Sequence, residues 1–282
     1  MSENLKKRII TAIVLLALVA AALTWLPPLG WLGFAALIAG LAGWEWGALA
    51  GHGAGLRVAY GLFCALAVLL LAAAGLDDWR HPHGPLLPVL YGVATAFWLL
   101  VVPLWLKRRW PAAGTLGSLT GLVVIVPSAL ALAQLRWPSA SFLLAAMALV
   151  WVADIAAYFS GRAFGRRKLA PAISPGKTWE GVYGALVAVN IYGALVLRYA
   201  LPPAVLDKLP SSAAGWALGL FAMLALTALS IIGDLFESLL KRQAGIKDSS
   251  QLLPGHGGVL DRIDSQTSTL PLVALVLALA AA

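Results

Sequence analysis

The chain has 282 residues, of which 61% are hydrophobic and only 11% are charged. Soluble domains carry about twice that share of charged residues, so the composition excludes a soluble protein and predicts a membrane protein. The net charge of +8 does not predict nucleic-acid binding, because the sequence lacks the aromatic stacking residues and basic stripes of nucleic-acid readers.

Apolar segments long enough to cross a bilayer recur along the chain. A helix needs about 20 predominantly apolar residues to span the hydrocarbon core. Nine such segments lie at 9–26, 30–50, 58–75, 86–106, 115–135, 141–160, 180–200, 213–235 and 266–282. We therefore expect an all-α polytopic membrane protein, folded as a single domain over residues 1–282, with about nine transmembrane helices.

The first apolar segment follows a basic start, Lys6-Lys7-Arg8, as the apolar region of a signal peptide also does. Its candidate cleavage site, the three alanines at 20–22, lies inside the apolar stretch, where cleavage is not expected. We expect the segment to stay in the protein as a membrane span.

Basic residues are unevenly distributed over the connecting segments. If the N-terminus is cytoplasmic, 16 of the 20 lysines and arginines face the cytoplasm. The cytoplasmic set is Lys6, Lys7, Arg8, Arg57, Lys107, Arg108, Arg109, Arg162, Arg166, Arg167, Lys168, Lys177, Lys241, Arg242, Lys247 and Arg262, and the outside set is Arg80, Arg136, Arg198 and Lys208. The positive-inside rule then predicts a cytoplasmic N-terminus and an outside C-terminus.

Four acidic residues fall within predicted spans or at their ends, where a charge at the span centre costs about 2.5–3.5 kcal/mol. Glu45 lies towards the cytoplasmic end of the second span, and we interpret it as structural. Asp154 precedes Tyr158 by one helical turn, and it is open to a structural hydrogen bond or a catalytic role. Asp234 and Glu237 lie where the eighth span reaches the cytoplasm.

A polar stripe is expected at the end of the eighth span. Residues at i, i+3, i+4 and i+7 share one face of an α-helix. This spacing joins Asp234, Glu237, Ser238 and Lys241. The stripe predicts an inward-facing functional surface, and the alternative is an interfacial ion pair that only anchors the helix end.

The segment 238–264 combines basic, acidic and glycine-rich elements. The turn 254–258 has backbone N–H groups that can approach an anion closely. His256 within it is open to the roles of general base, hydrogen-bond donor to phosphate or turn residue. Four cations suit phosphate oxygens, namely Lys241, Arg242, Lys247 and Arg262.

Asp261 and Asp264 are three residues apart, so they share a face if the helix leading into the last span has begun. Two close carboxylates repel each other, and Mg²⁺ is typically held by one or two carboxylates together with substrate phosphates. With Asp234 from the preceding span, they predict a metal–nucleotide site. The alternative is a surface helix start whose acidic residues complement the helix dipole.

A second polar loop is expected at 161–179, and the motif 174–181 lies at its end. Its Gly-Lys-Thr is similar to the end of a P-loop, but Pro171 stands where that motif needs glycine, and no strand is expected before it. Lys177, Thr178 and Ser174 remain candidates for phosphate contact without a P-loop fold.

The polar segment resembles the full signature of the bacterial-type phosphatidate cytidylyltransferase family, also called CDP-diacylglycerol synthases. The matching positions are Ser238, Leu240-Lys241-Arg242, Lys247-Asp248, Ser250, Leu253-Pro254, His256 to Val259 and Asp261 to Asp264. The segments 174–181 and 233–238 are similar to further motifs of the family. The resemblance covers roughly 160–265, and the active-site half is expected at about 141–282.

The resemblance implies a reaction of CTP with phosphatidate, with a divalent cation such as Mg²⁺, at the cytoplasmic side of the cell inner membrane. It also suggests a homodimer. The expected catalytic residues are Asp234, Lys241, Asp261, Asp264 and His256, of which the three aspartates are the expected metal ligands. The expected substrate-binding residues are Ser174, Lys177, Thr178, Ser238, Arg242, Lys247 and Arg262.

Two other functions fit parts of the sequence. A transporter or flippase of an anionic lipid could use Asp154 and Asp234 as an ion relay, but transporters often show paired broken helices and internal repeats. A CDP-alcohol phosphotransferase would need that family's Asp-Gly and spaced Ala-Arg pattern, which this sequence lacks.

Overall fold

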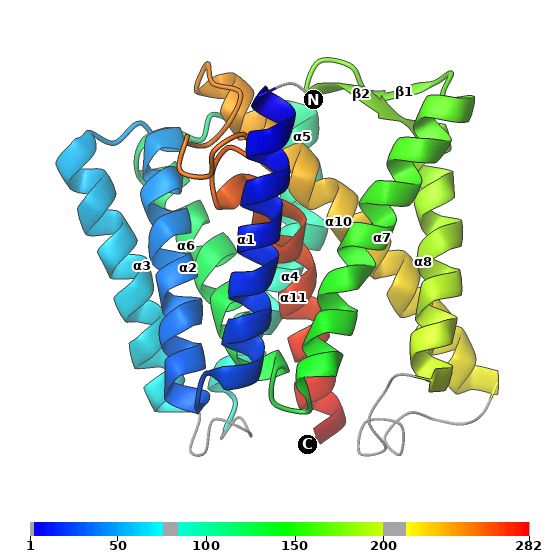
Figure 1. Ribbon diagram of the computed structural model, residues 1–282, viewed down its shortest axis with the longest axis horizontal. Coiled ribbons are helices and arrows are strands. Elements are labelled where there is room, and N and C mark those ends of the chain that lie inside the picture. The colour runs from blue at the N-terminus through cyan, green and yellow to red at the C-terminus, as the bar shows by residue number, and fades with distance from the viewer. Residues whose placement is uncertain (1–2, 76–83, 200–212, 282) are drawn as a thin grey trace.

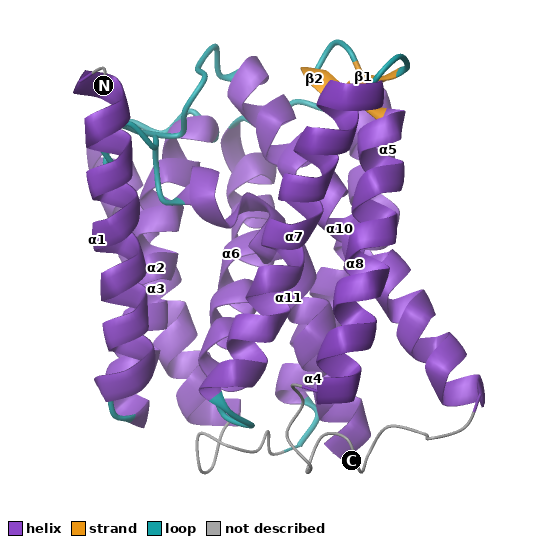
Figure 2. Cartoon of the chain, turned by 45° about the vertical axis from the view of Figure 1, so that its right-hand side comes forward, coloured by secondary structure: helices purple, strands orange, loops and turns teal. Residues whose placement is uncertain are grey.

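The computed structural model describes residues 3–75, 84–199 and 213–281. Its helices run roughly side by side, and the N-terminus and C-terminus lie at opposite ends of the bundle (Figure 1). The segment 244–259 and a short β-hairpin at 168–178 lie at the end that holds the N-terminus (Figures 1 and 2). We call this end of the molecule the loop end.

Helices account for most of the described residues. In chain order the elements are α1 (Glu3–Trp25), α2 (Pro28–Leu49), α3 (Ala54–Gly75), α4 (Leu86–Ala96), η1 (Phe97–Val101), α5 (Val102–Arg108), α6 (Gly114–Leu135), α7 (Ala140–Phe164), β1 (Lys168–Ala170), β2 (Ser174–Thr178), α8 (Trp179–Tyr199), α10 (Ala213–Gln243) and α11 (Leu260–Ala281). The elements α4, η1 and α5 are continuous. The π-helical turn η1 ends shortly before Pro103, whose missing N–H cannot complete an α-helical hydrogen bond.

Seven helical stretches in the described part of the chain are long and apolar enough to cross a membrane. They are α2, α3, the continuous stretch from α4 to α5, α6, α7, α8 and α10. The protein is therefore an all-α polytopic membrane protein, as its composition predicts. The apolar part of α1 is shorter, and α11 opens with a polar run, so the count of nine spans stays a prediction.

Three helices extend beyond the apolar segments at the loop end. The sequence predicts spans that end at residues 160 and 235 and a last span that begins at 266, whereas α7 reaches Phe164, α10 reaches Gln243 and α11 begins at Leu260. A helix satisfies its own backbone hydrogen bonds, so it continues past the apolar residues while its side chains become polar. Asp261 and Asp264 consequently lie in the first turns of α11.

The polar run 265–269 of α11 is buried at the centre of the bundle. Ser268 Oγ donates to the backbone oxygen of Leu229 in α10 at 2.8 Å. On another side of α11, Ser128 Oγ of α6 donates to the backbone oxygen of Thr267 at 2.7 Å. Buried polar groups require such partners, and here the bonds tie α11 to α10 and α6.

Four aromatic rings surround Phe236 of α10. The ring centroids of Trp46, Phe97, Trp98 and Trp105 lie 6.4, 6.2, 5.6 and 5.4 Å from that of Phe236. Phe236 is 1% exposed, so its position is fixed by packing against α2, η1 and α5. This packing fixes the rotation of α10 about its axis and therefore the direction in which its polar stripe faces.

The loop between α7 and α8 contains an antiparallel β-hairpin in which Lys168 pairs with Thr178 and Ala170 with Ser174. The sequence-based expectation that no strand precedes the Gly-Lys-Thr motif is wrong. Strand β1 has only three residues, and its pairing is local, so no hydrophobic alternation marked it. The hairpin still differs from a P-loop, in which a buried parallel strand leads into the phosphate-binding turn.

Candidate active site

The polar stripe of α10 meets the start of α11 at Lys241. Its Nζ donates to Glu237 Oε2 at 3.0 Å and to Asp261 Oδ1 at 2.6 Å. All three side chains are largely buried, with exposed fractions of 14% for Lys241 and 4% for each carboxylate. The polar stripe therefore lies on one face of α10, and the ion pair between Glu237 and Lys241 extends to Asp261. The functional role of the stripe stays a prediction.

The second oxygen of Asp261 is also occupied. Asp261 Oδ2 accepts hydrogen bonds from the Ser249 backbone N–H at 2.8 Å, from Ser249 Oγ at 2.9 Å and from the Gly258 N–H at 2.8 Å. We call the segment 244–259 the glycine-rich segment. Asp261 therefore joins Lys241 to residues on both sides of its turn, Ser249 and Gly258. Hydrogen bonds to charged groups are the stronger kind, so this aspartate has a defined orientation.

Glu45 of α2 accepts four hydrogen bonds from the same region. Its Oε1 accepts from Ser250 Oγ at 2.6 Å and the Val259 N–H at 2.9 Å. Its Oε2 accepts from Ser249 Oγ at 3.1 Å and the Leu260 N–H at 2.6 Å. The sequence predicts a structural role for Glu45 but gives no sign that it contacts the site, because its partners are more than 200 residues away.

Glycines allow these carboxylates to come close to the backbone. A Cβ on Gly257, whose φ is +81°, would lie 2.6 Å from Asp261 Oδ2. A Cβ on Gly258 would lie 2.6 Å from the Cδ of Glu45. The sequence predicts that this turn cradles an anion, and the anions seen at its N–H groups are the protein's own carboxylates.

The hairpin brings a second lysine to α10. Lys177 of β2 forms an ion pair with Asp234 Oδ2, and Ser238 Oγ donates to Asp234 Oδ1 at 3.2 Å. Both members of the ion pair are about a quarter exposed. Lys177 and Asp234 therefore form a second charged centre, distinct from that of Lys241 and Asp261, along the same face of α10.

Two further carboxylates lie close to the Lys177–Asp234 pair. Asp154 of α7 and Asp264 of α11 both interact electrostatically with Asp234 and with Lys177, and Asp264 also interacts with Asp154. Asp264 Oδ1 in addition accepts from the Ser265 N–H at 2.6 Å. Three helices thus each contribute one carboxylate around a single lysine.

The donor chemistry of this group fits a hard divalent cation. Within residues 3–75, 84–199 and 213–281, no group of three or more His, Cys, Asp or Glu side chains has the arrangement of a metal site. Mg²⁺, however, is usually held by one or two carboxylates plus substrate phosphates, so Asp234 and Asp264 supply suitable oxygens. Asp261, the third expected ligand, accepts from Lys241 Nζ at 2.6 Å through its Oδ1.

The hairpin is closed by Glu180, the acidic residue of the motif 174–181. Its Oε2 accepts from the backbone N–H groups of Arg166 at 3.0 Å and Arg167 at 3.2 Å. Thr178 Oγ1 accepts from the Gly181 N–H at 3.2 Å, and the side chain of Thr178 is buried. Thr178 thus caps the start of α8, which is a local role the motif did not reveal.

The remaining predicted site residues lie around these two centres. The side chains of Arg242, Lys247 and Arg262 are exposed at the loop end, and Ser174 in β2 is partly exposed. Nδ1 of His256 is buried and has no hydrogen-bond partner among the described residues. The cations could therefore meet an anion from solution, whereas the role of His256 stays a prediction.

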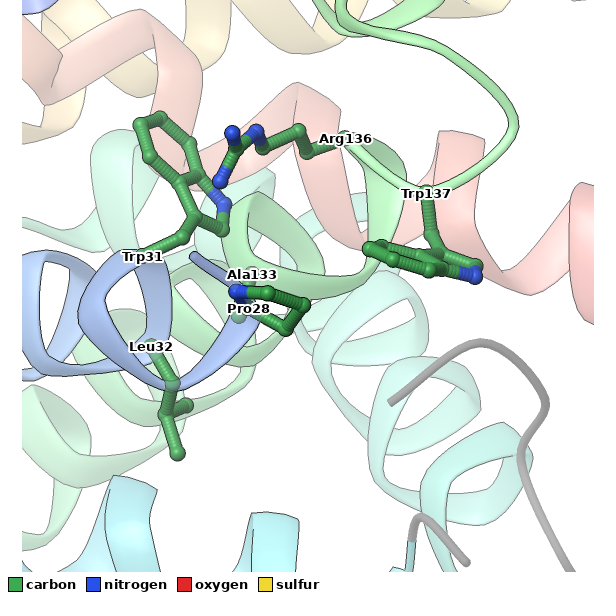
Figure 3. Close-up of a pocket in the computed structure, with 6 residues that line it drawn as sticks. All are labelled: Pro28, Trp31, Leu32, Ala133, Arg136 and Trp137. Carbon is green, nitrogen blue, oxygen red and sulfur yellow. The ribbon is translucent and has the colours of Figure 1, made fainter. Parts of the chain in front are cut away.

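A pocket at the opposite end of the bundle does not qualify as a substrate site. It is lined by Pro28, Trp31, Leu32, Ala133, Arg136 and Trp137, and its volume is about 10 Å³ (Figure 3). Arg136 lies over the Trp31 ring at 5.0 Å and donates to the backbone oxygen of Leu26 at 2.8 Å. A space of this size holds about one water molecule, so we interpret the pocket as packing between helix ends.

Comparisons with known proteins identify the family of the chain. A model of the cytidylyltransferase family matches residues 6–280, so the chain belongs to this family. A Pseudomonas aeruginosa protein named phosphatidate cytidylyltransferase is 42% identical over 279 residues, which cover 97% of each chain. Proteins of the same name from Haemophilus influenzae and Brucella suis are 37% and 39% identical, over 95% and 97% of this chain and 96% and 93% of their own.

Proposed function

We propose that the protein transfers CMP from CTP to phosphatidate, giving CDP-diacylglycerol and pyrophosphate. The observation that carries this proposal is the 42% identity, over almost the whole of both chains, to a protein named for this activity. The similarity includes both halves of the bundle, whereas the motif resemblance covers only the second half. The names of the relatives favour this enzyme over a lipid transporter.

The chemistry needs two polyanions to meet. An oxygen of the phosphatidate phosphate attacks the α-phosphorus of CTP, and the bond from that phosphorus to pyrophosphate breaks. No covalent enzyme intermediate is required, so positioning and neutralisation of charge supply most of the catalysis. Lys177 and Lys241 suit this task, because each ammonium group is already oriented by carboxylates near the loop end.

The catalytic set that we propose is Asp234, Lys241, Asp261, Asp264 and His256. Asp234 and Asp264 would hold Mg²⁺, and Asp261 would be the third ligand. A bound Mg²⁺ supplies electrophilic neutralisation of the phosphate oxygens. Among the chain's own residues, Lys241 orients Asp261, and Ser238 orients Asp234 through its hydroxyl.

Substrate phosphates would be bound by residues from both loops. The proposed set is Ser174, Lys177, Thr178, Ser238, Arg242, Lys247 and Arg262. The exposed cations among them can meet CTP first, and Lys177 can exchange its carboxylate partner for a phosphate. The contribution of Thr178 is indirect, because its side chain caps the start of α8.

We also propose nine spans, with the N-terminus and the loop end cytoplasmic and the C-terminus outside, in the cell inner membrane. The opposite positions of the two termini support an odd number of crossings (Figure 1). Arg57, Lys107 and Arg166 lie at or near the loop end, whereas Arg136 and Arg198 follow or end helices that run to the other end. A homodimer without nucleic-acid partners remains part of the proposal.

The proposal is tested with the full-length protein purified in detergent. CTP labelled in the cytosine is supplied with phosphatidate and Mg²⁺, and ATP, GTP, UTP and dCTP are compared. We expect lipid-soluble labelled product and free pyrophosphate only when phosphatidate is present, and only with a cytidine nucleotide. Product formation without phosphatidate, or none under any condition, would overturn the proposed function.

A further inference from the structure

Glu45 is a charged residue in a place where charge is costly. It lies in α2 between Trp44 and Trp46, and its exposed fraction is 0%. A carboxylate at such a depth needs several good partners. All four of its hydrogen bonds go to the glycine-rich segment and to the first residue of α11.

These bonds hold together the two sides of the turn in the glycine-rich segment. Ser249 and Ser250 precede its turn, whereas Val259 and Leu260 follow it. The N–H groups of Val259 and Leu260 lie at the start of α11, where a helix has no internal acceptors for its first N–H groups. A carboxylate there satisfies both N–H groups and interacts favourably with the helix dipole.

Glu45 and Asp261 share one intermediary. Ser249 Oγ lies 3.1 Å from Glu45 Oε2 and 2.9 Å from Asp261 Oδ2, and its single proton can serve only one of them at a time. The Gly258 N–H also binds Asp261 Oδ2, and a Cβ on Gly258 would lie 2.6 Å from the Cδ of Glu45. The orientation of Asp261 therefore depends on where Glu45 holds the segment.

We propose that Glu45 is a positioning residue for the active site. It fixes the glycine-rich segment and the first turn of α11, so that one oxygen of Asp261 is saturated by the segment and the other faces Lys241. The role in catalysis rests on the proposed function. The structural part of the proposal, which concerns the order of the segment, does not.

A residue that only stabilises the bundle would behave differently. Its loss would lower the fraction of folded protein and leave the surviving molecules with normal order at the loop end. Loss of a positioning residue leaves the bundle folded, but it loosens one segment and lowers kcat. Among the proposed substrate-binding cations, Lys177 and Arg242 lie outside the loosened segment, whereas Lys247 and Arg262 lie in it or next to it, so KM is expected to change less than kcat.

The test compares Glu45→Gln with Tyr91→Phe in the full-length protein in detergent. The glutamine keeps the size of the side chain, but its NH₂ group faces donors that need an acceptor. Tyr91→Phe also removes one buried hydrogen bond, from Tyr91 to Gln134 Oε1, on helices α4 and α6 away from the loop end. It therefore controls for a general loss of stability.

Two readouts are measured on both variants. Amide hydrogen exchange of 244–261 should accelerate about tenfold or more in Glu45→Gln, because charged acceptors of its N–H groups are lost. Exchange of the hairpin at 166–180 should stay unchanged. The kcat should fall by about 10- to 100-fold, as is typical when the partner that orients an active-site group is removed, with a smaller change in the KM values.

The outcomes separate the two proposals. Faster exchange of 244–261 and a lower kcat in Glu45→Gln, with neither change in Tyr91→Phe, support the positioning role. Unchanged exchange or a normal kcat in Glu45→Gln overturns it, as does an equal effect of both variants. If the unmodified protein makes no CDP-diacylglycerol, the proposed function fails, while the exchange result still decides whether Glu45 orders the segment.

If Glu45→Gln does not yield folded protein, Ser250→Ala replaces it. This change removes the bond from Ser250 Oγ to Glu45 Oε1 and leaves the carboxylate with its other three donors. It also removes the bond that Ser250 Oγ accepts from the Leu252 N–H at 3.1 Å, so the exchange of Leu252 is left out of the comparison. We expect the same pattern with about a threefold effect on exchange. No change in the exchange of 244–261 would contradict the proposal.

Discussion

The glycine-rich segment at 244–259 and the hairpin at 168–178 both bring motif residues to the loop end, but they are held in different ways. The segment is fixed by the carboxylates of Glu45 and Asp261. Glu45 is 0% exposed as a whole residue, and the side chain of Asp261 is 4% exposed. The hairpin is closed by Glu180, packs on the bundle through the buried side chain of Ile173, and forms an ion pair with α10 through Lys177. A partly exposed ion pair such as that of Lys177 and Asp234 contributes less to stability than a buried one with several hydrogen bonds.

This difference assigns different tasks to the two loops. A segment whose N–H groups are saturated by buried carboxylates keeps its shape when substrate arrives. A hairpin whose lysine is bound to a partly exposed aspartate can exchange that partner for a phosphate. We infer that the segment preserves the catalytic geometry and that the hairpin adapts to the substrate.

We call Lys241, Asp261 and the glycine-rich segment that binds Asp261 the rigid centre. The largest effect on activity is expected there, for Asp261→Asn. The amide cannot carry the charge that Lys241 and the segment both stabilise, so Lys241 keeps only one charged partner, Glu237. We expect CDP-diacylglycerol formation to fall by at least about 100-fold at saturating Mg²⁺, as for misplaced catalytic groups in general. The rate is measured with labelled CTP, and near-normal activity would exclude the proposed metal role of Asp261.

A pair of glycine substitutions tests the contrast between the loops directly. Gly258→Ala places a methyl group against the Glu45 carboxyl carbon, whereas a Cβ on Gly176 in the hairpin meets no atom within 4 Å. Overpacking at the first site should cost about 1–3 kcal/mol of stability. Gly176→Ala should be nearly neutral.

Thermal unfolding in detergent and hydrogen exchange of 244–261 measure both glycine variants. Equal effects of Gly258→Ala and Gly176→Ala would show that the two loops are held alike, contrary to the comparison above.

The smallest effect on activity is expected for a change in the hairpin at 168–178. Lys177→Ala removes the cation that we propose binds phosphate, and the bundle does not depend on it for packing. We expect kcat/KM for CTP to fall by about tenfold, mostly through KM. Lys177→Arg keeps the charge and should recover part of the loss. A fall in kcat with an unchanged KM would place Lys177 in the rigid centre instead.

The regular features of the protein could be predicted from its sequence. Helical periodicity alone joined Asp234 to Ser238 and Glu237 to Lys241, because contacts within four residues follow from helix geometry. Apolar stretches located the helices, but not their polar ends at Phe164 and Gln243. Local patterns therefore predicted the contacts within α10, which form one part of the candidate site.

The other half depends on contacts between distant segments. No local pattern indicates that Glu45 meets Ser250, or that Asp154 lies near Asp264, because helix packing brings them together. The sequence predicts that the glycines at 257–258 approach a phosphate, which stays a prediction, and it does not indicate that the carboxylates of Asp261 and Glu45 lie beside them. The family resemblance named candidate residues without indicating how they are arranged.

The link between Glu45 and α11 also bears on how the protein is made. Glu45 and Val259 are 214 residues apart, so α2 leaves the ribosome long before its partner exists. Chains are synthesised and begin to fold from the N-terminus, and a carboxylate without partners resists deep insertion. During synthesis the end of α2 must therefore stay near water, and insertion of the last helix completes the catalytic end of the membrane bundle.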